Sequence, residues 1–375
     1  MASKPLPHTR NGAMDAIKTW LTILVIFHHT AITYGSQGGW FYKEVLPSKS
    51  ISSLLLVYFC TINQAYFMGF FFLMAGYFTL PSLLQKSTSS FIRDRLIRLW
   101  LPLLFFGFVL GPLTIAIAQT AKDKDFFDSL IWLWKHRVFE VGPLWFARAV
   151  LIFSAIALIL HKLAPLPRFS FQHFPSNRSL AISAVACGLI AFAVRHLYPV
   201  GAELWSLQLG YFPMYVVLFA VGCLAAQEKW LERITPEVAT RWRCIALWAL
   251  PTLIPLGFLS KTFPLFQGSP LGGWNIPALM YAMWEPFIAW GAILWLLCYA
   301  HRRHAIQSPF AASLARRSFC VFVIHPVVVV SASIAWRTVQ APALLKFLVT
   351  GSISAVICFV LAGWILKLPW IRRVL

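Results

Sequence analysis

The chain has 375 residues, of which 59% are hydrophobic and only 12% are charged, and its mean hydropathy is +0.72. Soluble domains are usually about half apolar and about one quarter charged, so this composition excludes an ordinary soluble protein and favours a lipid bilayer as solvent. Lys and Arg outnumber Asp and Glu by 32 to 12, and because no loop interleaves aromatic and basic residues we expect anionic lipid or an anionic co-substrate rather than nucleic acid.

About ten apolar runs approach the length of about 20 residues that a membrane helix needs. We therefore predict an all-α fold, a polytopic bundle of about ten transmembrane helices that forms a single domain over residues 1–375. The N-terminal segment lacks a signal-peptide cleavage pattern, so the first run is expected to be a retained helix. The predicted spans are 16–35, 54–80, 99–119, 143–161, 179–198, 207–226, 243–260, 275–299, 317–336 and 343–367.

The basic residues of the connections give an orientation. If the N-terminus is cytoplasmic, the inside segments hold 21 of the Lys and Arg residues, the outside segments hold 10, and Arg148 lies within a span. Basic residues accumulate in cytoplasmic loops, so this bias predicts that both termini are cytoplasmic and that the number of spans is even. The largest hydrophilic connection, 120–141, then lies outside.

The first predicted helix carries Asp15, Lys18, His28 and His29. Lys18 and His29 are eleven residues apart, so they share one helix face at a separation of about 16 Å. With Lys18 at the cytoplasmic interface, His29 lies near mid-membrane, and Asp15 can pair with Lys18. His28 points about 100° away, so the two histidines cannot share a role. A buried histidine can simply bond to another helix, but the aligned lysine and the depth favour a function for His29.

Arginines open the third predicted span, in the sequence FIRDRLIRLWLP. Arg95 and Arg98 are three residues apart and therefore share a helix face. Guanidinium groups suit phosphate, and basic residues at this position also anchor a helix on the cytoplasmic side, so both interpretations stay open.

Polar residues also fall within later spans. Glu285 is the only acid that we expect deep in the bilayer, where a carboxylate needs a partner. His325 lies at a similar depth, and Pro326 beside it would free a backbone carbonyl. Trp145 and Arg148 lie just inside the outer boundary of the fourth span, where Trp145 either contacts a substrate or belongs to the interfacial belt. A cationic mouth with His and Glu at mid-depth favours a transferase.

The residues above give the sequence a resemblance to membrane acyltransferase family 3, the bacterial O-acyltransferases of O-antigen, Nod factor and periplasmic glucan. The resemblance spans most of the chain, and the run 211–225 with Trp284–Glu285 looks most like the glucan branch. Lys18 stands where many members have Arg, which weakens bidentate binding there. The matching residues are Asp15, Lys18 and His29; Arg95, Arg98 and Pro102; Gly142, Leu144, Trp145 and Phe146; and Ile324, His325 and Pro326.

The resemblance implies an O-acyltransferase of the bacterial inner membrane that moves acetyl or succinyl from cytoplasmic acyl-CoA to a hydroxyl of an envelope or periplasmic carbohydrate. His29 would act as general base, and transfer is either direct or through an acyl-histidine. Glu285 would act with it, orienting the imidazole or balancing a cation. Lys18, Arg95 and Arg98 would hold the phosphates of acyl-CoA, and Trp145, Arg148 and His325 would contact the acceptor.

Beyond acyl-CoA as co-substrate we expect no bound cofactor. Seven cysteines are scattered singly without a CxxC pair, so neither a disulfide framework nor a zinc site is expected. The main alternative function is a proton-coupled transporter that uses the buried His and Glu residues, although the chain has no repeats in matching halves. A scaffold or lipid sensor would leave the buried charges unexplained.

Overall fold

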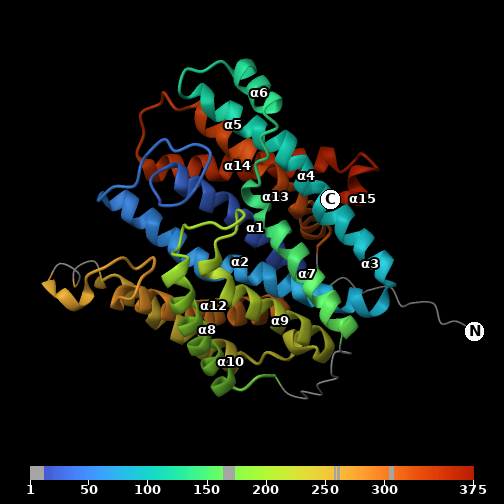
Figure 1. Ribbon diagram of the computed structural model, residues 1–375, viewed down its shortest axis with the longest axis vertical. Coiled ribbons are helices and arrows are strands. Elements are labelled where there is room, and N and C mark those ends of the chain that lie inside the picture. The colour runs from blue at the N-terminus through green and yellow to red at the C-terminus, as the bar shows by residue number, and fades with distance from the viewer. Residues whose placement is uncertain (1–11, 164–173, 257–258, 260–261, 304–307) are drawn as a thin grey trace, which may run out of the picture.

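The computed structural model describes residues 12–163, 174–256, 259, 262–303 and 308–375, and in these residues it is helical without a β-strand (Figure 1). The predicted all-α fold is confirmed. The prediction about a signal peptide concerns residues 1–11, which lie outside the described residues, and the cytoplasmic placement of both termini stays a prediction.

Nine helices in the described part of the chain are long and apolar enough to cross a membrane. Three of them are composite, because a short 3-10 or π segment continues into the main α-helix without a break. The nine spans are α1 (Gly12–Thr33), α2 (Ile51–Gln85), Thr88–Thr120, η3 with α7 (Gly142–Leu163), α8 (Asn177–Leu197), η4 with α9 (Leu209–Glu228), α12 (Ile276–Arg303), α13 (Pro309–Ala335) and α14 (Ala343–Ile365).

The third span changes its helical type along its length. Two π turns interrupt it, and a proline follows each of them, Pro102 and Pro112. A proline has no N–H to donate, so the turn before it is a natural place for a wider helix. The span consists of α3 (Thr88–Arg95), η1 (Leu96–Trp100), α4 (Leu101–Phe105), η2 (Phe106–Leu110) and α5 (Gly111–Thr120).

The predicted span 243–260 is the one that does not appear as a membrane-length helix in the described residues. Its described part belongs to α10 (Pro236–Ala249), which has 14 residues and continues as the 3-10 turn η6 (Leu250–Leu253), while residues 257, 258 and 260 lie outside the described residues. Pro251 and Pro255 end the regular α-helix here because neither can donate an intrahelical hydrogen bond. This explains why the described residues contain nine qualifying spans where the sequence predicts about ten.

The connection 120–141 is more ordered than its polar composition indicates. It contains the amphipathic helix α6 (Phe126–Lys135), which buries Leu130 and Leu133 and exposes Phe127, Ile131 and Trp132. Exposed aromatic residues of this kind suit a membrane interface. The other short elements are η5 (Trp230–Arg233), η7 (Pro264–Phe266) and α15 (Ile371–Val374).

Helix α1 occupies the middle of the bundle. It packs against α2, α12, α13 and α14, and in Figure 1 α5, α6 and α14 lie on one side of it and α8, α10 and α12 on the other. Glycines bring α2 and α9 into backbone contact, because a Cβ at Gly76 would lie 2.0 Å from the Phe219 carbonyl oxygen and one at Gly222 2.1 Å from that of Leu73. Most polar residues of α1 are buried in the bundle, whereas Lys18, Thr19 and His29 are partly exposed.

Candidate active site

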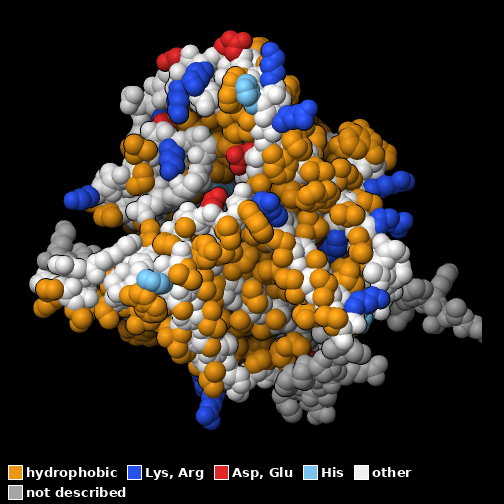
Figure 2. Space-filling model, viewed as in Figure 1, with side chains coloured by type: hydrophobic (Ala, Val, Ile, Leu, Met, Phe, Trp, Pro, Cys, Tyr) orange, Lys and Arg blue, Asp and Glu red, His pale blue; other side chains and the backbone are white. Residues whose placement is uncertain are grey.

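A cavity of about 690 Å³ opens among the loop after α1, the segment before α7 and the connection between α8 and α9. Figure 2 shows a largely hydrophobic surface with a hollow, and acidic side chains lie at the edge of that hollow. Aromatic walls with a few polar groups are typical of small-molecule sites. The lining of this histidine cavity includes His28, His29, Trp40, Gln64, Glu140, Trp145, Glu203, Gln208, Tyr211, Tyr215 and Tyr281.

Two histidines from opposite ends of the sequence meet at this cavity. His29 of α1 is half-buried and lines the cavity, whereas His325 of α13 lies behind it and is fully buried. The His29 Nδ1 and His325 Nε2 atoms are 3.0 Å apart, and the two rings are nearly parallel, at 13°. This distance is that of a hydrogen bond.

The surroundings of His325 determine which nitrogen carries each proton. Pro326 has no N–H, so the helix leaves the carbonyl of Phe322 free, and His325 Nδ1 lies 2.8 Å from that carbonyl oxygen. A carbonyl only accepts, so Nδ1 of His325 must carry its proton and Nε2 must accept one from His29 Nδ1. His29 then keeps a lone pair on Nε2, which has no hydrogen-bond partner among the described residues.

Trp40 stacks on one face of the His29 ring. The two ring centroids are 4.0 Å apart with an angle of 7° between the planes. The loop that presents Trp40 turns at Gly35 and Gly38, whose φ angles of +126° and +142° disfavour any other residue. The imidazole thus has an indole against one face and a hydrogen bond to His325 at its edge, which together restrict its orientation.

The neighbouring His28 has a different environment. Its ring stacks on Phe67 at 4.9 Å and stands at 89° to the ring of His29. It is buried, and its Nδ1 has no hydrogen-bond partner in the described residues. The expectation that the two histidines play different roles agrees with these positions.

Glu285 has the buried partner that its position requires, and this partner is Arg195 of α8. The guanidinium Nη2 contacts Glu285 Oε2, and Arg195 and Glu285 are only 1% and 6% exposed. Arg195 Nε also donates to the carbonyl of Gly210 at 3.0 Å. An ion pair inside a membrane bundle needs such additional hydrogen bonds to offset desolvation. Glu285 therefore balances a cation, and within the described residues no hydrogen bond or ion pair joins it to His29.

The ion pair supports one wall of the histidine cavity. The Arg195 guanidinium lies 5.2 Å from the ring centre of Tyr211 and 5.1 Å from that of Tyr281, and both tyrosines line the cavity. Cation–π contacts of this length are favourable and orient the rings. Arg195 and Glu285 thus act on the cavity through two tyrosines.

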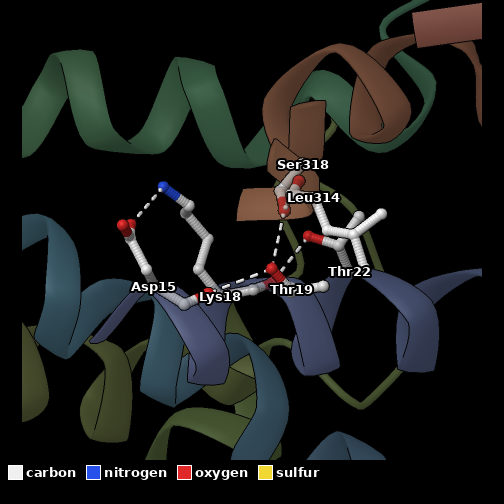
Figure 3. Close-up of polar contacts among 6 residues, drawn as sticks. All are labelled: Asp15, Lys18, Thr19, Thr22, Leu314 and Ser318. Atoms are coloured by element: carbon white, nitrogen blue, oxygen red, sulfur yellow. Dashed lines mark hydrogen bonds and ion pairs between the residues drawn. The ribbon is translucent and has the colours of Figure 1, made fainter. Parts of the chain in front are cut away.

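Lys18 lies near the start of α1, away from His29. Its ammonium Nζ is 3.2 Å from Asp15 Oδ1, as the sequence predicted, and Figure 3 shows the two side chains directed toward each other. The next residue, Thr19, lies 3.4 Å from Ser318 of α13 through their hydroxyl oxygens. The contact between Thr19 and Ser318 joins α1 to α13 at the end of the bundle where Lys18 lies. We call this end the lysine end.

The two arginines of the third span have unequal freedom. Arg95 Nη2 donates to the Thr79 hydroxyl at 3.0 Å, and its guanidinium lies 5.0 Å from the ring centre of Phe91. Arg98 is exposed, and no hydrogen bond or ion pair joins its side chain to another described residue. Only Arg98 therefore has its full set of donors available for a ligand.

Trp145 and Arg148 differ in whether they face the cavity. Trp145 lines the cavity and stacks on Tyr215 at 6.0 Å. Arg148 Nη1 donates to the Trp205 carbonyl at 2.7 Å, and Arg148 is not among the lining residues. Of the three residues expected to contact an acceptor, Trp145 alone faces the open space directly.

Comparison with known proteins gives the family of the chain. The profile of a family described as an acyltransferase domain matches residues 11–363. The protein belongs to this acyltransferase family. The resemblance inferred from the short motifs is thereby confirmed.

The chain is also similar to proteins that are named for glucan biosynthesis. Glucans biosynthesis protein C of Salmonella gallinarum (strain 287/91 / NCTC 13346) is 25% identical over 202 residues, which cover 53% of this chain and 50% of that protein. Glucans biosynthesis protein C of Escherichia coli O1:K1 / APEC is 25% identical over 168 residues, which cover 42% of this chain and 40% of that protein. The chain thus matches half of the length of these relatives or less. No solved structure matches it.

Sequence reasoning missed several residues of this candidate site. Arg195 is one of the ten basic residues that the orientation argument assigns to the outside segments. Its place in the last turn of an apolar helix could have identified it as a candidate for a buried charge. Tyr211 and Tyr281 carry no charge, and Trp40 lies in a loop, so neither hydropathy nor helix periodicity could select them. In the described residues no group of three or more His, Cys, Asp or Glu side chains could hold a metal ion, and all seven cysteines are free thiols.

Proposed function

We propose that the protein is an O-acyltransferase that moves an acyl group, acetyl or succinyl, from acyl-CoA at the lysine end to a hydroxyl of an envelope carbohydrate in the histidine cavity. The proposal includes a cytoplasmic lysine end and a bacterial inner membrane. It rests above all on the hydrogen-bonded chain from the Phe322 carbonyl through His325 to His29. That chain leaves one basic nitrogen at the cavity.

The histidine pair provides the elements of general-base catalysis. The acceptor hydroxyl gives its proton to His29 Nε2 while its oxygen attacks the carbonyl carbon of the thioester. His29 then carries a positive charge, which the Nε2 lone pair of His325 stabilises through the hydrogen bond from His29 Nδ1. The carbon–sulfur bond breaks, and the departing thiolate takes the proton from His29 to form the thiol of CoA.

A sugar acceptor agrees with the lining of the cavity. Trp40, Trp145 and the tyrosines offer flat apolar faces, and Glu140, Glu203 and Gln208 offer hydrogen-bonding groups beside them. The names of the relatives, glucans biosynthesis proteins, support a carbohydrate, and the family supports acyl transfer. Glu285 serves this proposal as a positioning residue, because it holds Arg195 behind Tyr211 and Tyr281.

The deciding experiment is acyl transfer in inverted membranes or proteoliposomes with labelled acetyl-CoA and succinyl-CoA. Wild type should move label into a carbohydrate fraction, and His29→Ala should lose about 10²–10⁴-fold in rate, the usual contribution of a general base. His136→Gln is a matched control, because His136 is exposed at the end of α6 and stacks only on Trp132.

Two outcomes would contradict the proposal. Full transfer by folded His29→Ala would exclude His29 as the base. Proton-linked solute uptake by the wild type, without consumption of either acyl-CoA, would favour the transporter instead.

A further inference from the structure

A second hollow lies at the lysine end, between the start of α13, the end of α14 and α15. Its volume is about 620 Å³. Three arginines line it, Arg316 and Arg317 from α13 and Arg372 from α15, and Ser313 lies beside them. We call this space the arginine hollow. No step of the proposed reaction uses it.

The arginines of this hollow have no counter-ion among the residues that the structure describes. Arg316 and Arg372 are exposed, and neither side chain has an ion pair or hydrogen bond with another described residue. Arg317 uses one nitrogen, Nη1, which donates to the Phe359 carbonyl at 3.2 Å. Leu375 also lines the hollow. Like charges around one space repel each other, so an anion between them is stabilised.

A glycine shapes the wall of the hollow. A Cβ at Gly363 of α14 would lie 2.9 Å from both Cζ and Nη1 of Arg317. The guanidinium therefore lies flat against the α14 backbone, in a position that a larger side chain would occupy. This contact directs the group along the wall and keeps the space between the arginines open.

The arginine hollow lies about two helical turns along α13 from the histidine pair. Arg317 and His325 are eight residues apart on α13, which is about 12 Å along the helix axis. Arg317 directly precedes Ser318, the partner of Thr19, and α15 packs against η1, which carries Arg98. The arginine hollow therefore lies at the same end of the bundle as Lys18 and Arg98, away from the histidine pair.

We propose that the arginine hollow binds a phosphate ester through Arg316, Arg317 and Arg372. Guanidinium groups bind phosphate oxygens with paired, charge-assisted hydrogen bonds, and three of them suit a doubly charged group. The phosphate comes either from the nucleotide part of the acyl donor or from the headgroup of an anionic lipid. The donor source rests on the proposed function, because the acyl arm would then run along α13 toward His29, whereas the lipid source does not.

The test measures binding alone, with the full chain in nanodiscs of phosphatidylcholine and CoA as the probe. The double variant Arg316→Gln/Arg372→Gln should raise the Kd for CoA about tenfold or more, as expected for lost charge-assisted hydrogen bonds. Arg373→Gln is the matched control, because Arg373 is an exposed neighbour that does not line the hollow, and its Kd should stay within about twofold.

Gly363→Leu tests the same site without a change of charge. The leucine would displace the guanidinium of Arg317 and fill part of the hollow, so the Kd should rise as in the arginine variant. Unfolding temperatures of all variants without ligand identify any that fail to fold.

A second arm distinguishes the sources of phosphate. The unfolding temperatures of wild type and of the double variant are measured in nanodiscs with and without phosphatidylglycerol. A higher Kd for CoA in the double variant supports the acyl donor as the source of phosphate. An unchanged Kd with loss of the stabilisation by phosphatidylglycerol supports the lipid headgroup. Equal CoA binding and equal lipid stabilisation in both proteins would overturn the proposal. Because no turnover is measured, this result stays separate from the His29→Ala transfer assay.

Discussion

The arginines at the two ends of the bundle are held in opposite ways. At the histidine cavity, Arg195 is almost fully buried and has a carboxylate, a carbonyl and two tyrosine rings as partners. At the lysine end, Arg316 and Arg372 face an open hollow that no Asp or Glu of the described residues lines. A buried charge must find its partners within the protein, whereas an exposed cluster without partners is available to a ligand. The first arrangement maintains a wall, and the second can bind.

The largest expected effect on stability comes from breaking the buried pair. Glu285→Leu or Arg195→Met alone should lower the free energy of unfolding by about 3–5 kcal/mol, because each leaves an uncompensated charge. The double variant should recover most of that loss. Denaturant unfolding in detergent measures both effects.

An exposed ion pair provides the control for this prediction. Lys86 and Asp94 are 2.5 Å apart at the surface, and Lys86→Gln should cost about 1 kcal/mol or less. Equal losses at Arg195 and Lys86 would contradict the distinction between buried and exposed charges that we draw.

An intermediate effect is expected at His325, on rate rather than on stability. His325→Leu removes the acceptor that orients His29 and stabilises its charged form, so kcat for acyl transfer should fall about 10–100-fold with little change in the KM for acyl-CoA. His325→Gln keeps an acceptor and a donor and should restore part of the rate. An increase in KM alone would indicate a binding role for His325 instead of a positioning role.

The smallest effect on stability belongs to the arginine hollow. Arg316→Gln and Arg372→Gln should change the free energy of unfolding by less than about 0.5 kcal/mol in neutral detergent, because neither side chain has an ion pair or hydrogen bond with another described residue. Urea unfolding without any anionic ligand is the measurement. A loss above about 2 kcal/mol would mean that these arginines stabilise the protein itself.

The sequence predicted those features that depend on local chemistry. Apolar runs located the nine described spans, since a bilayer-crossing helix leaves an unmistakable composition. His29 and Glu285 could be selected because ionisable groups are rare at membrane depth. The freed carbonyl beside Pro326 was also foreseeable, because a proline always removes one N–H donor.

The remaining features depend on how the helices pack. Nothing in the sequence indicates that Arg195 rather than another cation reaches Glu285, because that follows from the contact of α8 with α12. Trp40 reaches His29 only through a loop with two positive φ angles. The meeting of His29 with His325 joins helices at opposite ends of the chain, and hydropathy carries no information about such neighbours.

The absent N–H of Pro326 has a consequence for how this protein would respond to mutagenesis. A replacement scan would classify the proline as a kink, since Pro326 does not line the histidine cavity. Yet an alanine there would offer the Phe322 oxygen a second, backbone donor in competition with His325. With the His325 proton on Nε2, His29 Nδ1 would have to accept it, and the His29 proton would then occupy the nitrogen that faces the cavity. A residue without a functional group thus sets the direction in which a proton can travel.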